Sequence, residues 1–514
     1  MTNTAQNNKR IAKNTLLLYF RMLLTMAVSL YTSRVVLSTL GVEDYGIYNV
    51  VGGVVAMFSV ISGSLSAAIS RFITYELGKG DKKALENIFS SAVTIQFALG
   101  FIILILAEII GVWFLNTKMN IPENRIYATN WVFQLSIITF IINLISVPYN
   151  AAIIAHEKMS AFAYISILEV SAKLLIVYML LISPIDRLIF YAILMTSVAL
   201  IIRFVYGYYC KRHFEECNYH FIFDKDLLKR MFGFAGWNFI GSCSAILRDQ
   251  GGNIVINLFC GPAVNAARGI AYQVNSAING FVNNFMMALN PQITKSYASG
   301  NREYMMTLIY QGARLSFYIL MMLSLPVIIN VDYILELWLK TVPEHTSTFI
   351  QLVLIFTMSE AISNPLITAM LATGRIKNYQ IVVGGLQLLN LPISYILLKN
   401  GCIPETVLIV AICISQCCLF ARLYMLREMI ELSSKIFLNK VYLNVISVSI
   451  ISSILPVYVS NIIPENFINF IFICALSLLT SSLTILYIGC NSEERALVFK
   501  KAKQLKNKIL RIHD

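Results

Sequence analysis

The sequence predicts an all-α polytopic membrane protein with about 14 transmembrane helices, and three observations support this fold class. Of its 514 residues, 57% are hydrophobic and only 13% are charged, and the mean hydropathy is +0.70. Apolar runs of the roughly 20 residues that cross a bilayer recur from end to end. The alternating segments of about 10 residues that mark a transmembrane barrel are absent from the pattern.

Fourteen apolar runs can be placed in order along the chain. They are centred near residues 27, 60, 99, 140, 170, 196, 245, 279, 316, 360, 388, 416, 449 and 478. The first run follows a polar N-terminal segment that carries Lys9, Arg10 and Lys13. It is too long for a signal-peptide core and lacks a small-residue cleavage site, so we expect an uncleaved first span.

The basic residues alternate between the two sides of this arrangement. With the N-terminus inside, the cytoplasmic segments carry 26 Lys and Arg residues and the opposite loops carry 5. Because cytoplasmic loops are enriched in Lys and Arg, this bias predicts that both termini are cytoplasmic. The tail at 491–514 is basic and amphipathic; it either lies on the anionic inner leaflet or forms a solvated charged helix.

Two similar halves divide most of the chain. We expect an N-terminal lobe at 1–210, a cytoplasmic inter-lobe loop at 211–230, a C-terminal lobe at 231–430 and two further spans at 431–490. A shift of 220 residues pairs Gly41, Ile73, Thr74 and Gly80 with Gly261, Ile293, Thr294 and Gly300. A shift of 217 pairs Ser146, Pro148, Ala152 and Ala155 with Ser363, Pro365, Ala369 and Ala372.

These offsets predict two parallel six-helix lobes, an architecture of transporters in which a substrate binds between lobes that rock against each other. Pro148 and Pro365 fall inside apolar runs at equivalent places. Proline inside a helix frees a carbonyl and bends the helix. The pair therefore marks either hinges for gating or packing kinks.

Charged residues remain inside the predicted spans, with nine cations against four acids. The cations are Arg21, Arg34, Arg71, Lys173, Arg203, Arg248, Arg268, Arg314 and Arg422, and the acids are Glu108, Glu169, Asp249 and Glu360. Because a charge at the bilayer centre costs at least about 2.5–3.5 kcal/mol, such groups usually face a cavity or a partner.

The predicted depths of these charges separate their roles. Arg203, Arg314 and Arg422 lie near the inner surface, where snorkelling toward water accounts for them. Glu169 and Lys173 are four residues apart on one helix face, so they can form an ion pair. That pair either stabilises the helix bundle or faces a cavity. Adjacent Arg248 and Asp249 point in different directions along a helix, so we expect different partners for them.

The excess of positive charge suits an anionic substrate, because the guanidinium fork matches phosphate. We assign six cations to a substrate cavity: Arg21, Arg34, Arg71, Lys173, Arg248 and Arg268. Glu169, Asp249 and Glu360 would pair with them or carry a coupling ion. Asn275, Asn279 and Asn283, each four residues apart, form a polar stripe that suits either a cavity face or a hydrogen-bonded helix seam.

Other function classes find little support in the sequence. There is no GxxxxGK[ST] phosphate loop, no metal-ligand spacing and no pairing of nucleophile and base. A membrane glycosyltransferase or polymerase would need a large catalytic loop, whereas the longest internal loop has about 20 residues. We therefore expect no enzyme activity, no cofactor, no metal and no nucleic-acid partner, with H⁺ or Na⁺ as coupling ion.

Several stretches resemble the polysaccharide (Wzx-type) flippases of the multidrug/oligosaccharidyl-lipid/polysaccharide exporter (MOP) superfamily. They are "NTLLLYFRMLLTMAVSLYTSRVVLSTLGVEDYGIYNVV" near the N-terminus, "SRFITYELGKGD", and its counterpart "NPQITKSYASGN". Fourteen spans fit the lipid-linked flippase branch better than the twelve-span drug extruders. Lipid II flippases of this superfamily use cavity arginines on the first, second and eighth helices, where Arg21, Arg34, Arg71 and Arg268 stand here.

The resemblance implies that the chain moves an undecaprenyl-pyrophosphate-linked oligosaccharide, such as an O-antigen repeat unit, across the bacterial inner membrane. Its partners would be that lipid-linked oligosaccharide, the bilayer, and a polysaccharide polymerase with other assembly proteins. A cation-coupled multidrug antiporter of the same fold is the alternative. Those transporters commonly carry an essential acid in the first helix, whereas residues 14–40 contain no Asp or Glu.

Overall fold

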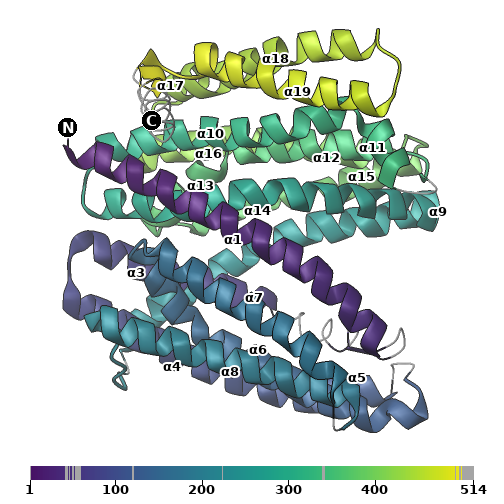
Figure 1. Cartoon of the computed structure of the whole chain (residues 1–514). Helices are drawn as coiled ribbons and strands as arrows, with labels where there is room; N and C mark the ends of the chain where they lie inside the picture. The colour runs from purple at the N-terminus through teal and green to yellow at the C-terminus, as the bar shows by residue number, and fades with distance from the viewer. Residues whose placement is uncertain are drawn as a thin grey trace, which may run out of the picture. The chain divides into compact units, whose positions relative to one another are not determined.

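The structure is a computed structural model that describes residues 2–40, 44, 47–48, 51, 59–117, 121–183, 185–222, 224–338, 342–492, 494–496 and 499. Every regular element in these ranges is helical, so the all-α fold class is confirmed (Figure 1). The chain forms two compact units. Unit 1 comprises Met1–Cys243, Met287–Arg302 and Leu371–Gln380, and unit 2 comprises Ser244–Met286, Glu303–Met370 and Ile381–Asp514.

Unit 1 is built mainly from the first half of the chain. Its helices are α1 (Thr2–Leu40), α3 (Ser59–Lys79), α4 (Lys82–Leu106), α5 (Val112–Thr117), α6 (Ile126–Ala155), α7 (Met159–Leu181) and α8 (Arg187–His213), with short helical turns η1 (Ala107–Gly111), η2 (Glu123–Arg125) and η3 (Glu215–Cys217). Helix α6 packs against α3, α4 and α8, and α1 packs against α7. Figure 1 shows α4 and α8 running along α6.

Unit 2 is built mainly from the second half. Its helices are α10 (Arg302–Ile329), α11 (Val331–Trp338), α12 (Thr346–Ala361), α13 (Asn364–Thr373), α14 (Lys377–Leu388), α15 (Asn390–Lys399), α16 (Thr406–Ile430), α17 (Ser434–Phe437), η4 (Leu438–Leu443), α18 (Asn444–Ser460), α19 (Phe467–Thr484) and η5 (Ile485–Gly489). The last residues of α13 and the first residues of α14 belong to unit 1. Helix α16 packs against α12 and α15, and α18 packs against α19.

Helix α9 (Lys225–Ala298) contributes to both units and folds back on itself. The Arg268 guanidinium donates to the Asp249 carbonyl at 3.2 Å. In one straight helix these residues would lie about 28 Å apart, because each residue rises about 1.5 Å. The two legs of α9 therefore run past each other, and they coincide with the predicted spans near 245 and 279.

The spans agree with the expected order. Within the described residues, ten helices are long and apolar enough to cross a membrane, or eleven if the pair α12 and α13, bent by 40°, forms one span. The remaining predicted spans correspond to α3 and the two legs of α9. The structure is thus consistent with fourteen spans, and that number stays a prediction.

Apolar side chains cover the outside of the helices as well as the inside. Phe101, Ile109, Phe204 and Ile468 are each more than half exposed. A surface of this kind suits lipid, where every backbone group is satisfied within its helix.

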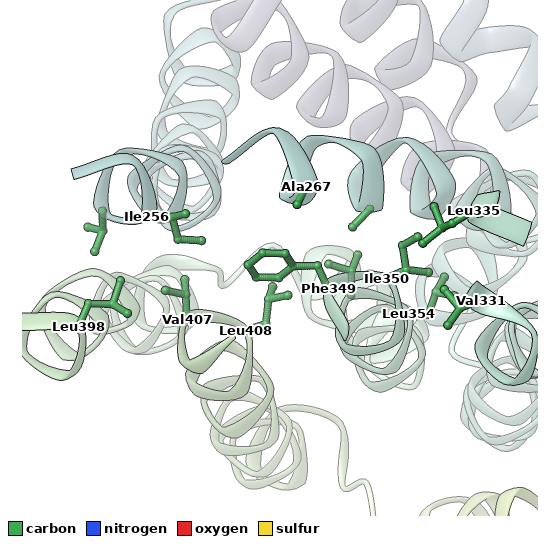
Figure 2. Packing of buried hydrophobic residues seen from close by; sticks show 13 residues of the cluster. Ile256, Ala267, Val331, Leu335, Phe349, Ile350, Leu354, Leu398, Val407 and Leu408 are labelled. Atoms are coloured by element: carbon green, nitrogen blue, oxygen red, sulfur yellow. The ribbon is translucent and has the colours of Figure 1, made fainter. Parts of the chain in front are cut away.

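The core of unit 2 contains Ile256 and Ala267 on α9, Phe349 on α12, and Val407 and Leu408 on α16. Figure 2 shows these side chains meeting between the helices. In a bilayer such contacts stabilise helix association through close packing more than through exclusion of water.

Polar caps and bridges close the ends of the unit 1 helices. Asp186 caps α8 by accepting from the amides of Leu188 and Ile189. Arg125 joins Asp186 at 2.6 Å and Asp44 at 2.7 Å. Burial opposes ionisation of Asp186, but the Arg125 guanidinium and the two amides outweigh it, so the pKa of Asp186 lies below its usual value.

The internal repeat is visible in the backbone conformation. Gly80 and Gly300, 220 residues apart, have φ of 81° and 76°. Glu157 and Gly374, 217 residues apart, have φ of 59° and 75°. The recurrence of positive φ at both offsets agrees with the repeat seen in the sequence, and Glu157 is the one non-glycine among the four, a residue type in which positive φ is uncommon.

The predicted domain boundaries at 210, 230, 430 and 490 stay predictions. Helix α8 ends at His213 and α9 begins at Lys225, inside the expected inter-lobe loop. Gly41, one of the paired repeat glycines, and residues 501–514 of the basic tail lie outside the described residues.

Candidate functional site

Four of the predicted site residues gather inside unit 2. We call Arg248, Asp249, Arg268 and Glu360 the arginine–acid cluster. Three come from the two legs of α9 and Glu360 comes from the last turn of α12. Because the legs run past each other, residues far apart in sequence meet between apolar helices.

Arg268 is the most buried member of the cluster, with 3% of its surface exposed. Its guanidinium donates to the Asn253 side-chain oxygen, to the Asp249 carbonyl and, at 3.0 Å, to the Tyr272 hydroxyl. All three acceptors are neutral. Within the described residues no carboxylate pairs with Arg268, so its positive charge is balanced only by dipoles.

Small and aromatic residues fit closely around this guanidinium. A Cβ atom at Gly252 would lie 3.1 Å from Arg268 Nη2, so glycine permits the close approach of the two legs. The Arg268 guanidinium carbon also lies 4.5 Å from the centre of the Tyr272 ring. These contacts hold the cation in place without neutralising it.

Arg248 and Asp249 form an ion pair with each other, with Nε and Oδ1 at 2.9 Å. The expectation that these neighbours need different partners is therefore wrong. The long arginine side chain turns back to the next carboxylate, and its guanidinium lies 5.0 Å from the Phe356 ring centre. Only 12% of the Arg248 side chain is exposed, against 40% for Asp249.

Glu360 completes the cluster from α12. It accepts from the Ser415 hydroxyl of α16 at 2.6 Å, and its charge acts on the Arg248 guanidinium. Ser415 also contacts Ser359 at 3.1 Å. The cluster thus has two cations and two acids, with one acid directly paired.

A second charged group lies within unit 1. Lys173 and Glu169 pair at 2.6 Å on α7, as their spacing predicts. Arg21 of α1 donates to Ser166 at 3.4 Å, its guanidinium lies 4.7 Å from the Phe162 ring centre, and the Glu169 charge acts on it. Arg21, Glu169 and Lys173 are therefore brought together, while their role in binding stays a prediction.

Two predicted cations stand apart from these groups. Arg71 of α3 donates to the carbonyls of Leu371 and Ala372 at the end of α13. Arg34 lies within α1, and its side chain is outside the part of the chain that the structure describes.

The predicted asparagine stripe does not form one uniform face. Asn275 and Asn279 are half-buried, whereas Asn283 is exposed. The Oδ1 atom of Asn275 is buried and has no hydrogen-bond partner among the described residues. Asn275 thus offers an unused acceptor.

The two predicted hinge prolines differ in their surroundings. Pro365 is the second residue of α13, directly after the 40° bend between α12 and α13. Pro148 lies inside the continuous helix α6. The bend accompanies Pro365 alone, and a role of either proline in gating stays a prediction.

Snorkelling is wrong for two of the three arginines expected to reach the inner surface. Arg422 is only 1% exposed and Arg314 only 8% exposed. Arg314 instead pairs with Glu494 at 2.7 Å and donates to the Gly489 carbonyl at 2.9 Å. Arg203 is half-buried, and its guanidinium lies 3.9 Å from the Tyr149 ring centre.

Comparison with known proteins places these features in a family. The family model "Polysaccharide biosynthesis protein" matches residues 11–297. The MatE family model matches residues 242–396. EpsK of Bacillus subtilis (strain 168), described as an uncharacterized membrane protein, is 20% identical over 299 residues. That alignment covers 57% of this chain and only 58% of EpsK.

Solved transporter structures share the fold. A MATE structure in the bent conformation gives a TM-score of 0.72 at 13% identity, covering 83% of this chain and 96% of that one. The Vibrio cholerae MATE transporter VcmN gives 0.69 at 14% identity, covering 84% and 98%. A MOP superfamily transporter from Pyrococcus furiosus gives 0.68 at 13% identity, covering 83% and 96%. At these identities the likeness shows the fold alone.

Proposed function

Because the chain belongs to the polysaccharide biosynthesis protein family and is a multi-pass membrane transporter of the MOP superfamily, we propose that it flips a lipid-linked oligosaccharide. The cargo is an oligosaccharide repeat unit, such as an O-antigen unit, on undecaprenyl pyrophosphate. It moves from the inner to the outer leaflet by alternating access, so the protein acts as a transporter and performs no covalent chemistry.

The observation that carries this proposal is the state of Arg268. Its guanidinium is buried and, among the described residues, donates only to neutral acceptors, so it keeps a positive field inside an apolar helix bundle. Such a charge is costly unless a ligand compensates it. A pyrophosphate offers that compensation, since arginine binds phosphate oxygens through two parallel hydrogen bonds.

The pairing of Arg248 suggests how the cluster responds to cargo. When the site is empty, Asp249 neutralises Arg248. An entering pyrophosphate competes for Arg248, and the released carboxylate then takes up a cation. Asp249 and Glu360 are therefore the proposed carriers of the coupling H⁺ or Na⁺, and Glu169 plays the same part beside Arg21 and Lys173.

The remaining assignments rest on the charge bias of the loops, for the orientation, and on the resemblance to flippases, for the membrane, the path and the partners. Both termini face the cytoplasm, and the membrane is the bacterial inner membrane. Arg34 and Arg71 contribute to the path of the anionic head group. A polysaccharide polymerase and other assembly proteins receive the flipped unit.

A cation-coupled drug antiporter is the second candidate, favoured by the MatE match over residues 242–396. The charge of the described helices opposes it, because α1 carries Arg21 and Arg34 and its residues 14–40 contain no acid. A cationic drug would be repelled by this helix.

Deletion of the gene tests the two candidates in one experiment. We expect loss of surface glycan, accumulation of lipid-linked oligosaccharide inside the cell, and unchanged resistance to cationic drugs. Restored export by the wild-type gene is the control. Normal surface glycan together with increased drug sensitivity would favour the antiporter and contradict the flippase.

A further inference from the structure

A basic pocket of about 510 Å³ lies within unit 1. Three segments that are distant in sequence form it: the end of α3, the first turns of α9, and the link from α13 to α14. Its cations are Arg71, Lys79, Lys229, Arg230, Arg375 and Lys377. Among the described residues that line it, Glu76 is the one acid.

The cations of the basic pocket outnumber its acids. Within the described residues, no ion pair joins any of the six to a carboxylate. Arg71 donates to the carbonyls of Leu371 at 3.3 Å and Ala372 at 3.0 Å, which are neutral acceptors. These two bonds hold the guanidinium at the pocket wall, where the Glu76 charge acts on it without forming an ion pair.

Aromatic rings accompany these charges. The Arg71 guanidinium lies 4.8 Å from the ring centre of Phe72 and 4.6 Å from that of Tyr75. The Lys377 ammonium lies 5.5 Å from the Trp237 ring centre. Aromatic and basic side chains gather in this way at the level of lipid head groups.

Comparison of the two halves of the internal repeat shows that the basic pocket lacks a carboxylate found at the equivalent position of the other half. Gly374, in its wall, is the counterpart of Glu157 at the 217-residue offset, and both have positive φ. Glu157 places its buried carboxylate between Arg10 and Lys295, at 2.8 Å from each. Gly374 has no side chain, and the Arg71 guanidinium lies against it, so this wall of the pocket lacks the carboxylate that the other half has.

We propose that the basic pocket binds the phosphate or pyrophosphate group of a lipid head group in place of the missing carboxylate. Several lysines and arginines around one cavity match the charge of a pyrophosphate. The lining segments adjoin loops predicted to be cytoplasmic, so the lipid comes from the inner leaflet. The lipid is either the transported substrate, an identity that rests on the proposed function, or a resident anionic phospholipid of the same chemistry.

Trp237 provides a direct probe of binding. The full chain in detergent micelles, with the other three tryptophans changed to phenylalanine, reports only from the pocket wall. The ligands are undecaprenyl pyrophosphate, phosphatidylglycerol, phosphatidylcholine and inorganic pyrophosphate. We expect saturable changes in Trp237 emission with undecaprenyl pyrophosphate or phosphatidylglycerol, and none with phosphatidylcholine.

Two variants test the role of the cations. The double variant Lys229→Gln/Arg230→Gln should weaken lipid binding by at least about tenfold, since it removes two charge-assisted contacts. The matched control Lys158→Gln/Lys211→Gln removes the same charge from exposed positions outside the pocket and should leave the affinity unchanged. Equal affinities in the two double variants would overturn the proposal.

Gly374→Glu places an internal carboxylate in the basic pocket. Its Cβ would lie 2.7 Å from Arg71 Nη2, so the far end of the Arg71 side chain has to shift, and Glu157 shows that glutamate adopts this backbone conformation. We expect a folded protein with at least about tenfold weaker lipid binding, because the new carboxylate competes with the ligand. Undiminished lipid affinity in a folded Gly374→Glu protein would contradict the proposal.

The ligand series separates the sources. The lipid that binds with the higher affinity, undecaprenyl pyrophosphate or phosphatidylglycerol, is identified as the ligand, and either result supports the proposal. Inorganic pyrophosphate binding as tightly as both lipids would overturn the assignment to a lipid head group. If the wild-type protein binds the lipid but does not flip lipid-linked oligosaccharide, the proposed function is wrong and the basic pocket remains a lipid site.

Discussion

Replacing Arg268 by glutamine is expected to reduce glycan export about 100-fold. The residue contributes a buried guanidinium that pairs with no carboxylate among the described residues. A bidentate contact to phosphate is worth about 3 kcal/mol, which corresponds to roughly a factor of 100. Glutamine can still bond to neighbours such as Tyr272, so the fold should survive. The measurement is surface glycan in gene-deleted cells that express the variant at wild-type membrane levels.

Two further variants sharpen this prediction. Arg268→Lys keeps the charge but loses the fork geometry, so export should fall between wild type and Arg268→Gln. Arg203→Gln is the matched control, since Arg203 is also an arginine in an apolar helix but contacts Tyr149 outside the cluster. Wild-type export by Arg268→Gln would contradict the assignment of Arg268 to the substrate path.

Replacing Glu157 by alanine is expected to destabilise unit 1 by about 3 kcal/mol. The Glu157 side chain is 1% exposed, pairs with Arg10 and Lys295, and accepts from Gln292. Its backbone carbonyl also accepts from Asn14 at 3.3 Å. Alanine would remove the carboxylate that pairs with the largely buried Lys295 and the half-exposed Arg10, while the turn keeps its positive φ. The measurement is the unfolding midpoint in detergent, compared with wild type.

The matched variants separate charge from backbone strain. Glu157→Gly removes the same carboxylate but suits the positive φ, so it should be more stable than Glu157→Ala by about 1 kcal/mol. Glu215→Gln breaks the exposed pair with Lys82, in which both side chains are 79% exposed, and should leave the unfolding midpoint nearly unchanged. Equal stability of Glu157→Ala and wild type would show that the buried carboxylate does not hold these helices together.

Much of the fold is predictable because a bilayer sets the apolar length that each membrane-spanning helix needs. Apolar length determines the spans, and the order of α4, α6, α7, α8 and the later helices follows the apolar runs. The repeat offsets of 220 and 217 also point to turns that share positive φ. Helix α3 and the legs of α9 are less apolar, because they carry charged residues of the candidate site such as Arg71 and Arg268.

The site was only partly predictable. Spacing along one helix correctly paired Glu169 with Lys173, since such a contact is local. It failed for Arg248 and Asp249, because a long flexible side chain can reach a neighbouring carboxylate that leaves the helix in another direction. The partners of Arg314 lie about 175 residues away in sequence, and hydropathy carries no information about such contacts.

The basic pocket was missed for a related reason. Lys79, Lys229, Arg230, Arg375 and Lys377 look like ordinary loop charges in the sequence. Three segments must fold together before these charges form one cavity. The signal that could have found it is the repeat, in which a carboxylate of one half is replaced by a glycine in the other.

A flipping assay in proteoliposomes measures directly whether the purified protein moves lipid-linked oligosaccharide between leaflets. Fluorescently labelled lipid-linked oligosaccharide, extracted from cells that carry the gene, is incorporated with purified protein, and a membrane-impermeant reductant reports which leaflet holds the label. We expect wild-type protein under a proton or sodium gradient to make the label fully accessible, whereas vesicles with Arg268→Gln stay near the one-half accessibility of protein-free vesicles. Accessibility no greater with wild-type protein than without it, under either gradient, would show that the protein does not flip this lipid.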